Sequence, residues 1–243
     1  MASCEVPAKD VDFGPLNFPK NVDVNDDLPS EETLAKIADY SLLDVNGKQV
    51  PFRSLYEGTN GEKKHKVLVI FVRHFYCGSC QDYLEYLCTG LPSPTELQAL
   101  PEAVSVIIIG CGAPSLIPFY AEKTSCTFRI YSEPTRHLYS VLQMTKSMAR
   151  SETLPKYIKN TSLFESFMRS ARQAWARVTH GDALKGGPGD QVGGEFLFED
   201  GKMTWCHRMR NTMDHSDLQK IREVLTLPIA ETSEEILTGV NNT

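Results

Sequence analysis

The sequence lacks the features that would place the protein in a membrane, on a secretory route or on nucleic acid. No apolar run approaches the roughly 20 residues that a transmembrane helix needs. The first ten residues, MASCEVPAKD, contain neither the basic nor the apolar region of a secretory signal. The formal net charge of −6 disfavours binding to a phosphate backbone. We therefore expect a cytoplasmic protein with no nucleic-acid partner and no membrane association.

The cysteines do not follow the pattern of a disulfide-stabilised or zinc-binding domain. There are seven, an odd number, and only Cys77 and Cys80 are closely spaced. A closed zinc site needs four ligands, but the sequence has no second C-x-x-C and no closely spaced histidine pair. We therefore expect no metal and no organic cofactor. The remaining cysteines within the predicted domain are expected to pack as small core residues: Cys88, Cys111, Cys126 and Cys206.

The two ends of the chain differ in composition from its middle. Residues 1–28 are rich in aspartate and proline and show little periodicity, which indicates an irregular or disordered acidic arm. A short helix is expected to follow Ser30, whose side chain can cap it. Asn46-Gly47 lies between two β-compatible runs, a strong signal for a hairpin. Residues 228–243 are predicted to form a tail, which leaves 29–227 as the folded domain.

Strand and helix patterns alternate through the middle of the chain. Strands are expected at 66–72, 104–110 and 127–132, and helices at 78–89, 115–123 and 134–144. The valine- and isoleucine-rich strands suit burial on both faces, and the alternation is typical of an α/β fold whose βαβ part is parallel. A second hairpin is predicted at Asp200-Gly201. A last helix is predicted at about 214–226, with Asp214 as its N-cap.

A helical insertion at 160–192 interrupts this pattern. Within it, residues 162–178 have one apolar face and a second face with three arginines, and a glycine-rich loop follows at 180–194. Three interpretations stay open for this helix. It can pack against the sheet, act as a lid, or present its apolar face to a partner or a membrane surface.

Cys77-Gly78-Ser79-Cys80 lies where a buried strand is expected to turn into a helix. Free N–H groups and partial positive charge at a helix start stabilise a thiolate, which is the reactive form of cysteine. Cys77, at the exposed mouth of this turn, is predicted to be the nucleophile, and Cys80 the resolving thiol. Arg73 and His74, just upstream, could add positive potential. The alternative is that the two cysteines are ordinary buried residues.

Three segments resemble the peroxiredoxin-like 2 family, proteins with an AhpC/TSA-type antioxidant-enzyme domain. The most specific elements are Arg73-His74-Phe75-x-Cys77-x-x-Cys80, Gly193-Gly194, His207-Arg208 and Asp214-His215. The resemblance implies a thioredoxin-like, peroxiredoxin-like three-layer sandwich, with a central mixed β-sheet flanked by helices. It also implies thiol-dependent redox activity, in some relatives toward peroxides or endoperoxides.

The sequence departs from typical peroxiredoxins at the peroxide-binding residues. The typical motif is P-x-x-x-T-x-x-C, but here His74 occupies the threonine position and the proline is missing. Gly193-Gly194 stands where typical enzymes carry an arginine that pairs with the thiolate. Arg73 or Arg208 could supply the missing guanidinium.

Taken together, these observations predict a thiol oxidoreductase with Cys77, Cys80 and Arg73 as its catalytic residues. Its substrate would be a peroxide or a disulfide, and a dithiol reductant of the thioredoxin or glutathione type would regenerate it. The alternative is a non-catalytic thioredoxin-like module, used for interaction or redox regulation.

Overall fold

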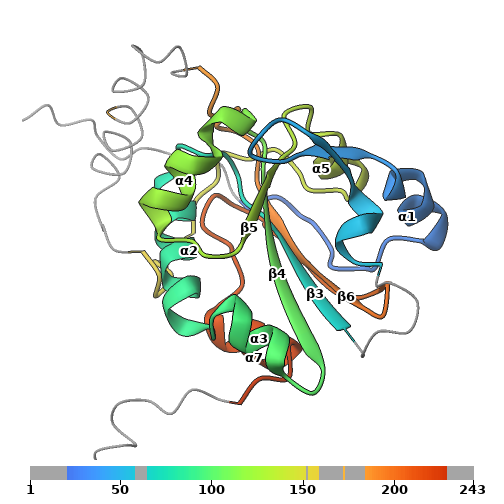
Figure 1. Cartoon of the computed structure of the whole chain (residues 1–243). Helices are drawn as coiled ribbons and strands as arrows, with labels where there is room; N and C mark the ends of the chain where they lie inside the picture. Colours follow the sequence, from blue (N-terminus) through green and yellow to red (C-terminus); the bar gives the residue numbers. More distant parts are fainter. Residues whose placement is uncertain (1–20, 58–64, 152, 159–171, 173–183, 229–243) are drawn as a thin grey trace, which may run out of the picture.

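The computed structural model describes residues 21–57, 65–151, 153–158, 172 and 184–228 (Figure 1). These residues build a seven-stranded sheet in the order β2-β1-β5-β4-β3-β6-β7. The strands are β1 (Ser41–Leu43), β2 (Gln49–Pro51), β3 (His65–Phe71), β4 (Ala103–Gly110), β5 (Arg129–Ser132), β6 (Gly194–Glu199) and β7 (Lys202–Arg208). The three strands expected in the middle of the chain are therefore present.

The sheet is mixed, as predicted. Strand β4 pairs in parallel with both β3 and β5, because helices connect these strands across one face of the sheet. Strands β6 and β7 continue the sheet beyond β3 in antiparallel pairing. Both predicted hairpins are confirmed. Their turns use left-handed backbone angles at Gly47 (φ 75°), Asp200 (φ 48°) and Gly201 (φ 81°).

Helices cover both faces of the sheet and give the expected three layers (Figure 1). One face packs against α2 (Gly78–Gly90), α3 (Pro94–Ala99), η2 (Pro114–Leu116), α4 (Ile117–Thr124) and α7 (Leu218–Val224). The other face packs against α1 (Glu31–Ala38), η1 (Phe52–Leu55) and α5 (His137–Val141). In the part of the chain that the structure describes, no helix is long and apolar enough to cross a membrane.

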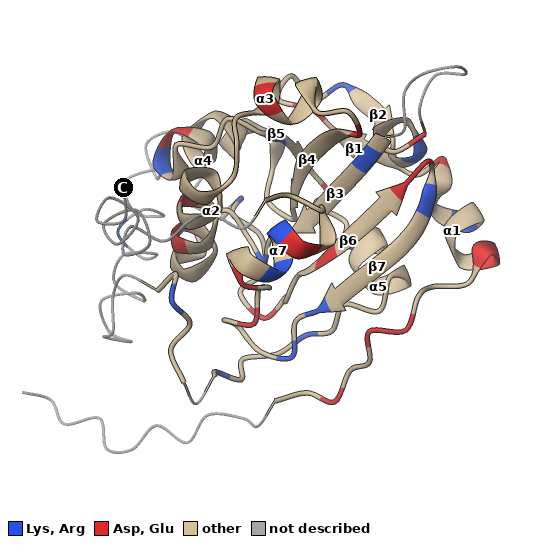
Figure 2. Cartoon of the chain, turned by 90° about the horizontal axis from the view of Figure 1, so that it is seen from below, with Lys and Arg blue, Asp and Glu red and all other residues tan. Residues whose placement is uncertain are grey.

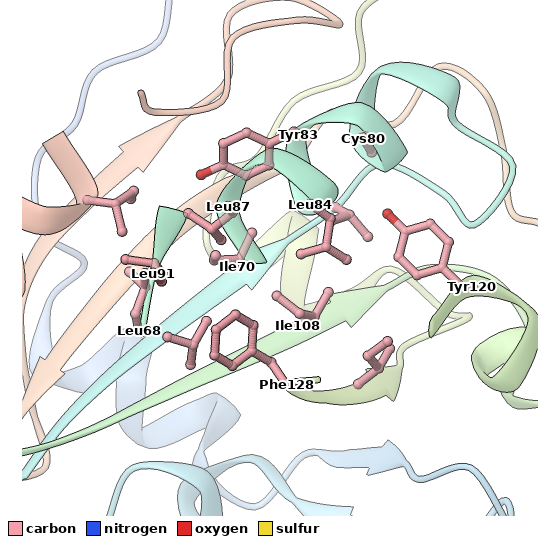
Figure 3. Close-up of a cluster of buried hydrophobic side chains, with 14 of the residues drawn as sticks. Leu68, Ile70, Cys80, Tyr83, Leu84, Leu87, Leu91, Ile108, Tyr120 and Phe128 are labelled. Carbon is pink, nitrogen blue, oxygen red and sulfur yellow. The ribbon is translucent and has the colours of Figure 1, made fainter. Parts of the chain in front are cut away.

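An apolar cluster fixes helix α2 against the sheet. Figure 3 shows Cys80, Leu84 and Leu87 on α2 above Ile70 and Ile108 on the strands. All five side chains are fully buried. Burying one such leucine contributes roughly 1.5–3 kcal/mol. The position of the α2 N-terminus is therefore set by packing along the helix.

Two helices differ from the sequence-based expectation. Helix α3 was not predicted, although Ser93-Pro94-Thr95-Glu96 carries the capping-box signal that the structure uses. The predicted cap at Asp214 is wrong, because the last helix begins at Leu218 and Asp217 caps it through the backbone N–H of Gln219. Asp214 instead forms an ion pair with Arg210 at 2.7 Å.

Other predictions fall largely outside the described residues. Of the predicted amphipathic helix at 162–178, only residue 172 is described, so its three interpretations stay untested. Residues 1–20 of the predicted arm and 229–243 of the predicted tail also lie outside.

The described part of the arm, residues 21–28, has no regular structure and runs past strand β7 (Figure 2). The Arg208 guanidinium donates to the carbonyls of Asn25 and Asp27 at 3.0 Å each. The Asp26 carboxylate accepts from the Arg208 backbone N–H at 2.7 Å and lies 3.1 Å from Nδ1 of His207. His207 and Arg208 therefore fasten the arm to the sheet edge.

This attachment predicts a pH-dependent stability. Burial lowers the pKa of His207, but the Glu195 charge, the Asp214 carbonyl and Asp26 together raise it above its ordinary value. Because the pKa of His207 is higher in the folded protein than in the unfolded chain, protonation of His207 stabilises the fold. This contribution is fully present below about pH 6.5 and is lost as pH rises through the folded-state pKa. Between pH 6 and pH 8, we expect wild-type protein to lose roughly 1–2 kcal/mol more stability than His207→Gln.

Urea unfolding at the two pH values measures this difference. The exposed imidazole of His137 provides the control, because His137→Gln should keep the wild-type pH dependence. Equal pH dependence in wild type and His207→Gln would contradict the attachment as described.

Candidate active site

Cys77 occupies the N-cap position of helix α2. Strand β3 ends at Phe71, and a turn closed by the Cys77 N–H on the His74 carbonyl (2.9 Å) leads into the helix. The Cys77 sulfur then accepts the backbone N–H of Cys80 at 3.4 Å. This is the place where serine or aspartate oxygens normally cap a helix, and it gives the sulfur the same acceptor role. The predicted strand-to-helix junction is confirmed.

Several donors surround the Cys77 sulfur. Nη1 of Arg73 lies at 3.3 Å and Oγ of Ser79 at 3.2 Å. Burial opposes ionisation, but the hydrogen bond with Cys80 and the charge of Arg73 bring the pKa of Cys77 well below its ordinary value. Burial and the neighbouring Cys77 sulfur raise the pKa of Cys80 well above the ordinary value. The site therefore favours a thiolate at Cys77 beside a protonated thiol at Cys80.

Arg73 is a buried guanidinium held by the backbone of a distant loop. It is 7% exposed, and its Nε donates to the Gln191 carbonyl at 3.2 Å. Its Nη2 donates to the Gly189 carbonyl. These hydrogen bonds hold the Arg73 guanidinium in an orientation in which Nη1 faces the Cys77 sulfur. The other predicted candidate, Arg208, is committed to the arm and to the Leu142 carbonyl (2.7 Å), so it does not supply this charge.

Sequence reasoning missed a second arginine near the sulfur. Burial and Arg73 lower the pKa of Arg150, whereas the charge of Cys77 raises it, so both groups lie within electrostatic range. A hydrogen-bond chain runs through the same region. The Ala149 carbonyl accepts from the backbone N–H of Thr212 at 2.9 Å, and the Thr212 carbonyl accepts from Ser79 Oγ at 3.1 Å. No motif around Arg150 signals this placement, because the segment has little regular structure.

His74 adds no positive charge at neutral pH. Burial lowers the pKa of His74 to about 4, with Arg73 acting in the same direction and Cys77 opposing it. The imidazole that occupies the threonine position of typical peroxiredoxins is therefore neutral. The expectation that His74 adds positive potential therefore applies to its protonated form, whose charge lowers the pKa of Cys77.

The prediction that Cys77 lies at an exposed mouth was also wrong. Cys77 is only 3% exposed. Residues 184–192, which we call the cover segment, pack across the turn that carries it. The Gly186 carbonyl accepts from the Phe75 N–H at 3.0 Å, and the Lys185 carbonyl from the Ala113 N–H at 2.7 Å. A Cβ at position 186 would lie 2.2 Å from the Tyr76 ring, so glycine permits this close approach.

Cys111 borders the same site as a protonated thiol. Its Sγ donates to the Arg73 carbonyl at 2.8 Å. Burial is the main reason why the pKa of Cys111 is raised to about 12. Cys111 therefore reaches the rim of the site but lacks the electrostatic activation of Cys77.

A polar cavity of about 380 Å³ borders Gln191, the residue whose carbonyl holds Arg73. Its other lining residues are Thr135, Arg136, Ser140, Gln143, Met144, Thr145 and Lys146. Two cationic side chains and no carboxylate line it, which suits a small polar or anionic molecule. Among the described residues, no three His, Cys, Asp or Glu side chains are grouped to hold a metal ion.

Comparison with known proteins finds a matching family model and several relatives. The model of the AhpC/TSA antioxidant enzyme family matches residues 93–211. The human protein "Peroxiredoxin-like 2C" is 27% identical over 194 residues, which cover 79% of each chain. The chain is therefore similar to peroxiredoxin-like 2 proteins over 79% of its length. The bovine Peroxiredoxin-like 2C is 29% identical over 79% of this chain and 78% of the relative. The chloroplastic thioredoxin-like protein AAED1 of Arabidopsis thaliana is 26% identical over 76% and 68%.

Among solved structures, peroxiredoxin Q of Xanthomonas campestris has a TM-score of 0.47 and 14% identity, over 82% of this chain and 92% of that one. The match to the family model and the sheet topology together support the thioredoxin-like fold. The matched residues of the family model begin after Cys80, so the Cys77–Cys80 pair lies outside that match.

Proposed function

We propose that the protein is a thiol-dependent oxidoreductase in which Cys77 is the nucleophile and Cys80 the resolving thiol. The observation that carries this proposal is the set of polar groups around one sulfur. The Cys80 N–H and the Arg73 guanidinium donate to the Cys77 Sγ, and the Ser79 Oγ lies within hydrogen-bond distance of it. A buried thiol without such partners is inert, whereas this arrangement favours the reactive thiolate.

With a peroxide as substrate, the Cys77 thiolate attacks one peroxide oxygen. The S–O bond forms as the O–O bond breaks, and the leaving oxygen takes a proton to give water or an alcohol. Cys77 is then a sulfenic acid. Cys80 attacks this sulfur, the S–S bond forms, and water leaves. An endoperoxide would follow the same steps with both oxygens kept in one product, and a disulfide substrate would give a mixed disulfide in place of the sulfenic acid.

A dithiol reductant of the thioredoxin or glutathione type would return the Cys77–Cys80 disulfide to two thiols. The role we propose for Arg73 is electrostatic. Its Nη1 lies 3.3 Å from the sulfur, where it stabilises the thiolate and the negative charge that develops on the departing oxygen. Reaction also requires the cover segment to move, because Cys77 is 3% exposed when the segment is in place.

Stoichiometric oxidation tests the assignment. One equivalent of hydrogen peroxide is added to reduced protein, free thiols are blocked, and disulfides are mapped by mass spectrometry. We expect a Cys77–Cys80 disulfide in wild-type protein and none that involves Cys80 in Cys77→Ser. In Cys80→Ser, Cys77 should be trapped as a sulfenic acid by dimedone. Loss of the same thiols in wild type and Cys77→Ser would show that Cys77 is not the nucleophile.

The burial of the sulfur favours a second candidate function, a thioredoxin-like module without turnover. In that case the Cys77–Cys80 pair would be regulatory or vestigial. Its reduction potential separates the two functions. A potential near that of thioredoxin, about −270 mV, permits turnover by cellular dithiols, whereas a much more negative value favours the module.

A further inference from the structure

The two partly exposed cysteines of the described chain lie next to each other. Cys77, Cys80, Cys111 and Cys206 are buried, whereas Cys88 and Cys126 are only partly buried. The sulfurs of Cys88 and Cys126 share a side-chain hydrogen bond. Of the six cysteines that the structure describes, the two most exposed are therefore a contacting pair outside the site described above.

The fold brings these two residues together from separate helices. Cys88 lies in the last turn of α2, and α2 and α4 lie side by side on one face of the sheet (Figure 1). Helix α4 ends in a left-handed residue, Ser125 (φ 50°), and the Cys126 N–H then bonds the Ala121 carbonyl at 3.0 Å. This reversal turns the chain back toward α2. The Thr127 backbone amide provides a second hydrogen bond to the Cys88 sulfur.

We propose that Cys88 and Cys126 form a second redox-active dithiol, which hydrogen peroxide or a small disulfide oxidises reversibly to a Cys88–Cys126 disulfide. This site is separate from the Cys77–Cys80 pair. Cys88 follows Cys77 by eleven residues along α2, about 16 Å at the rise of an α-helix, so the two sites do not exchange disulfides within one molecule in the folded state.

The surroundings assign different roles to the two sulfurs. The hydrogen bond from Cys126 lowers the pKa of Cys88, aided by the Thr127 amide and opposed by burial. The same contact, together with burial, raises the pKa of Cys126. The contacts agree with this difference, because the Cys88 sulfur accepts from the Thr127 amide, whereas the Cys126 Sγ donates to the Phe128 carbonyl at 3.8 Å. Cys88 is therefore the thiolate that attacks, and Cys126 is the thiol that resolves.

The chemistry consumes one peroxide for two thiols. The Cys88 thiolate attacks a peroxide oxygen, the O–O bond breaks, and the released hydroxide takes a proton to become water. The Cys126 sulfur then attacks the Cys88 sulfenic acid, the S–S bond forms, and a second water leaves. With a small disulfide, Cys88 first forms a mixed disulfide and Cys126 displaces the second thiol. The product would tie the end of α2 to the turn before β5.

Peptide mapping after oxidation tests the proposal in both wild-type protein and Cys77→Ser. A small excess of hydrogen peroxide should produce a Cys88–Cys126 disulfide in both proteins, and dithiothreitol should remove it. Under reducing conditions at pH 7, Cys88 should react with iodoacetamide at least roughly tenfold faster than Cys126. Cys126→Ser should leave Cys88 as a sulfenic acid that dimedone traps. The control Cys206→Ser removes a buried thiol and should leave the new disulfide unchanged.

The proposal is overturned if wild-type protein and Cys77→Ser both consume peroxide but neither forms a disulfide between Cys88 and Cys126. It is also overturned if Cys126→Ser and Cys206→Ser give the same Cys88 product. Cys77→Ser removes the nucleophile of the proposed function. A Cys88–Cys126 disulfide in that variant would therefore support the second dithiol whether or not the Cys77 assignment is right.

Discussion

Replacing Arg73 with glutamine is expected to raise the pKa of the Cys77 thiol and to slow its alkylation at pH 6 by roughly tenfold or more. The guanidinium lies 3.3 Å from the sulfur and is 7% exposed, so its charge acts with little screening by solvent. Without this charge, the hydrogen bond from the Cys80 N–H remains, but less of the cost of burying a thiolate is offset.

The measurement is the alkylation rate of Cys77 as a function of pH, followed by mass spectrometry of the peptide. The pH profile is decisive, because Arg73→Gln also releases the carbonyls of Gly189 and Gln191 and can change access to the sulfur. A change in access scales the rate at every pH, whereas a change in pKa moves the midpoint. Arg73→Lys should give an intermediate midpoint, and exposed Arg129→Gln should give the wild-type profile. An unchanged midpoint in Arg73→Gln would refute the electrostatic role.

Replacing Glu195 with glutamine is expected to cost about 1–3 kcal/mol of folding stability, the range for a buried polar group that loses a hydrogen bond to a charged partner. Oε1 of Glu195 lies 2.5 Å from Nδ1 of His215, and the two side chains are 0% and 1% exposed. The Tyr83 ring stacks on the imidazole with centroids 4.2 Å apart. The substitution leaves His215 buried without its anionic acceptor, in a position that water does not reach.

Urea unfolding at pH 7 measures this loss, and Glu223→Gln is the matched control. Glu223 pairs with Lys220 on the surface of α7, and its side chain is 69% exposed. That pair is expected to contribute less than about 1 kcal/mol. A similar loss in the two variants would mean that the Glu195–His215 contact does not contribute as a buried hydrogen bond.

The local parts of this fold could be predicted from the sequence, because their signals lie within a few residues of each other. The valine- and isoleucine-rich run before Cys77 and the spacing to Cys80 gave the strand, the turn and the start of α2. Asn46-Gly47 and Asp200-Gly201 gave the hairpins. Helix α3 was equally predictable, because Ser93 and Glu96 form a recognisable capping box.

The environment of the sulfur could not be predicted, because it is built by residues far away in the chain. Arg150, Thr212 and the cover segment come from parts of the sequence that carry no shared motif. The same holds for Cys88 and Cys126, which meet only because α2 and α4 pack together. Asp214 suggested a helix start three residues too early, since its carboxylate has a competing partner in Arg210.

The cover segment has a kinetic consequence for any reagent that reaches Cys77. Because Cys77 is only 3% exposed, we expect the observed rate to be the product of an opening pre-equilibrium and the intrinsic rate of the open form. An ionised thiol can then react slowly with every bulky electrophile, while compact oxidants are less affected. The ionisation of Cys77 and its apparent reactivity are therefore separate quantities in this protein. Comparing the reaction rates of reagents of increasing size would measure the opening of the cover segment independently of the ionisation of the thiol.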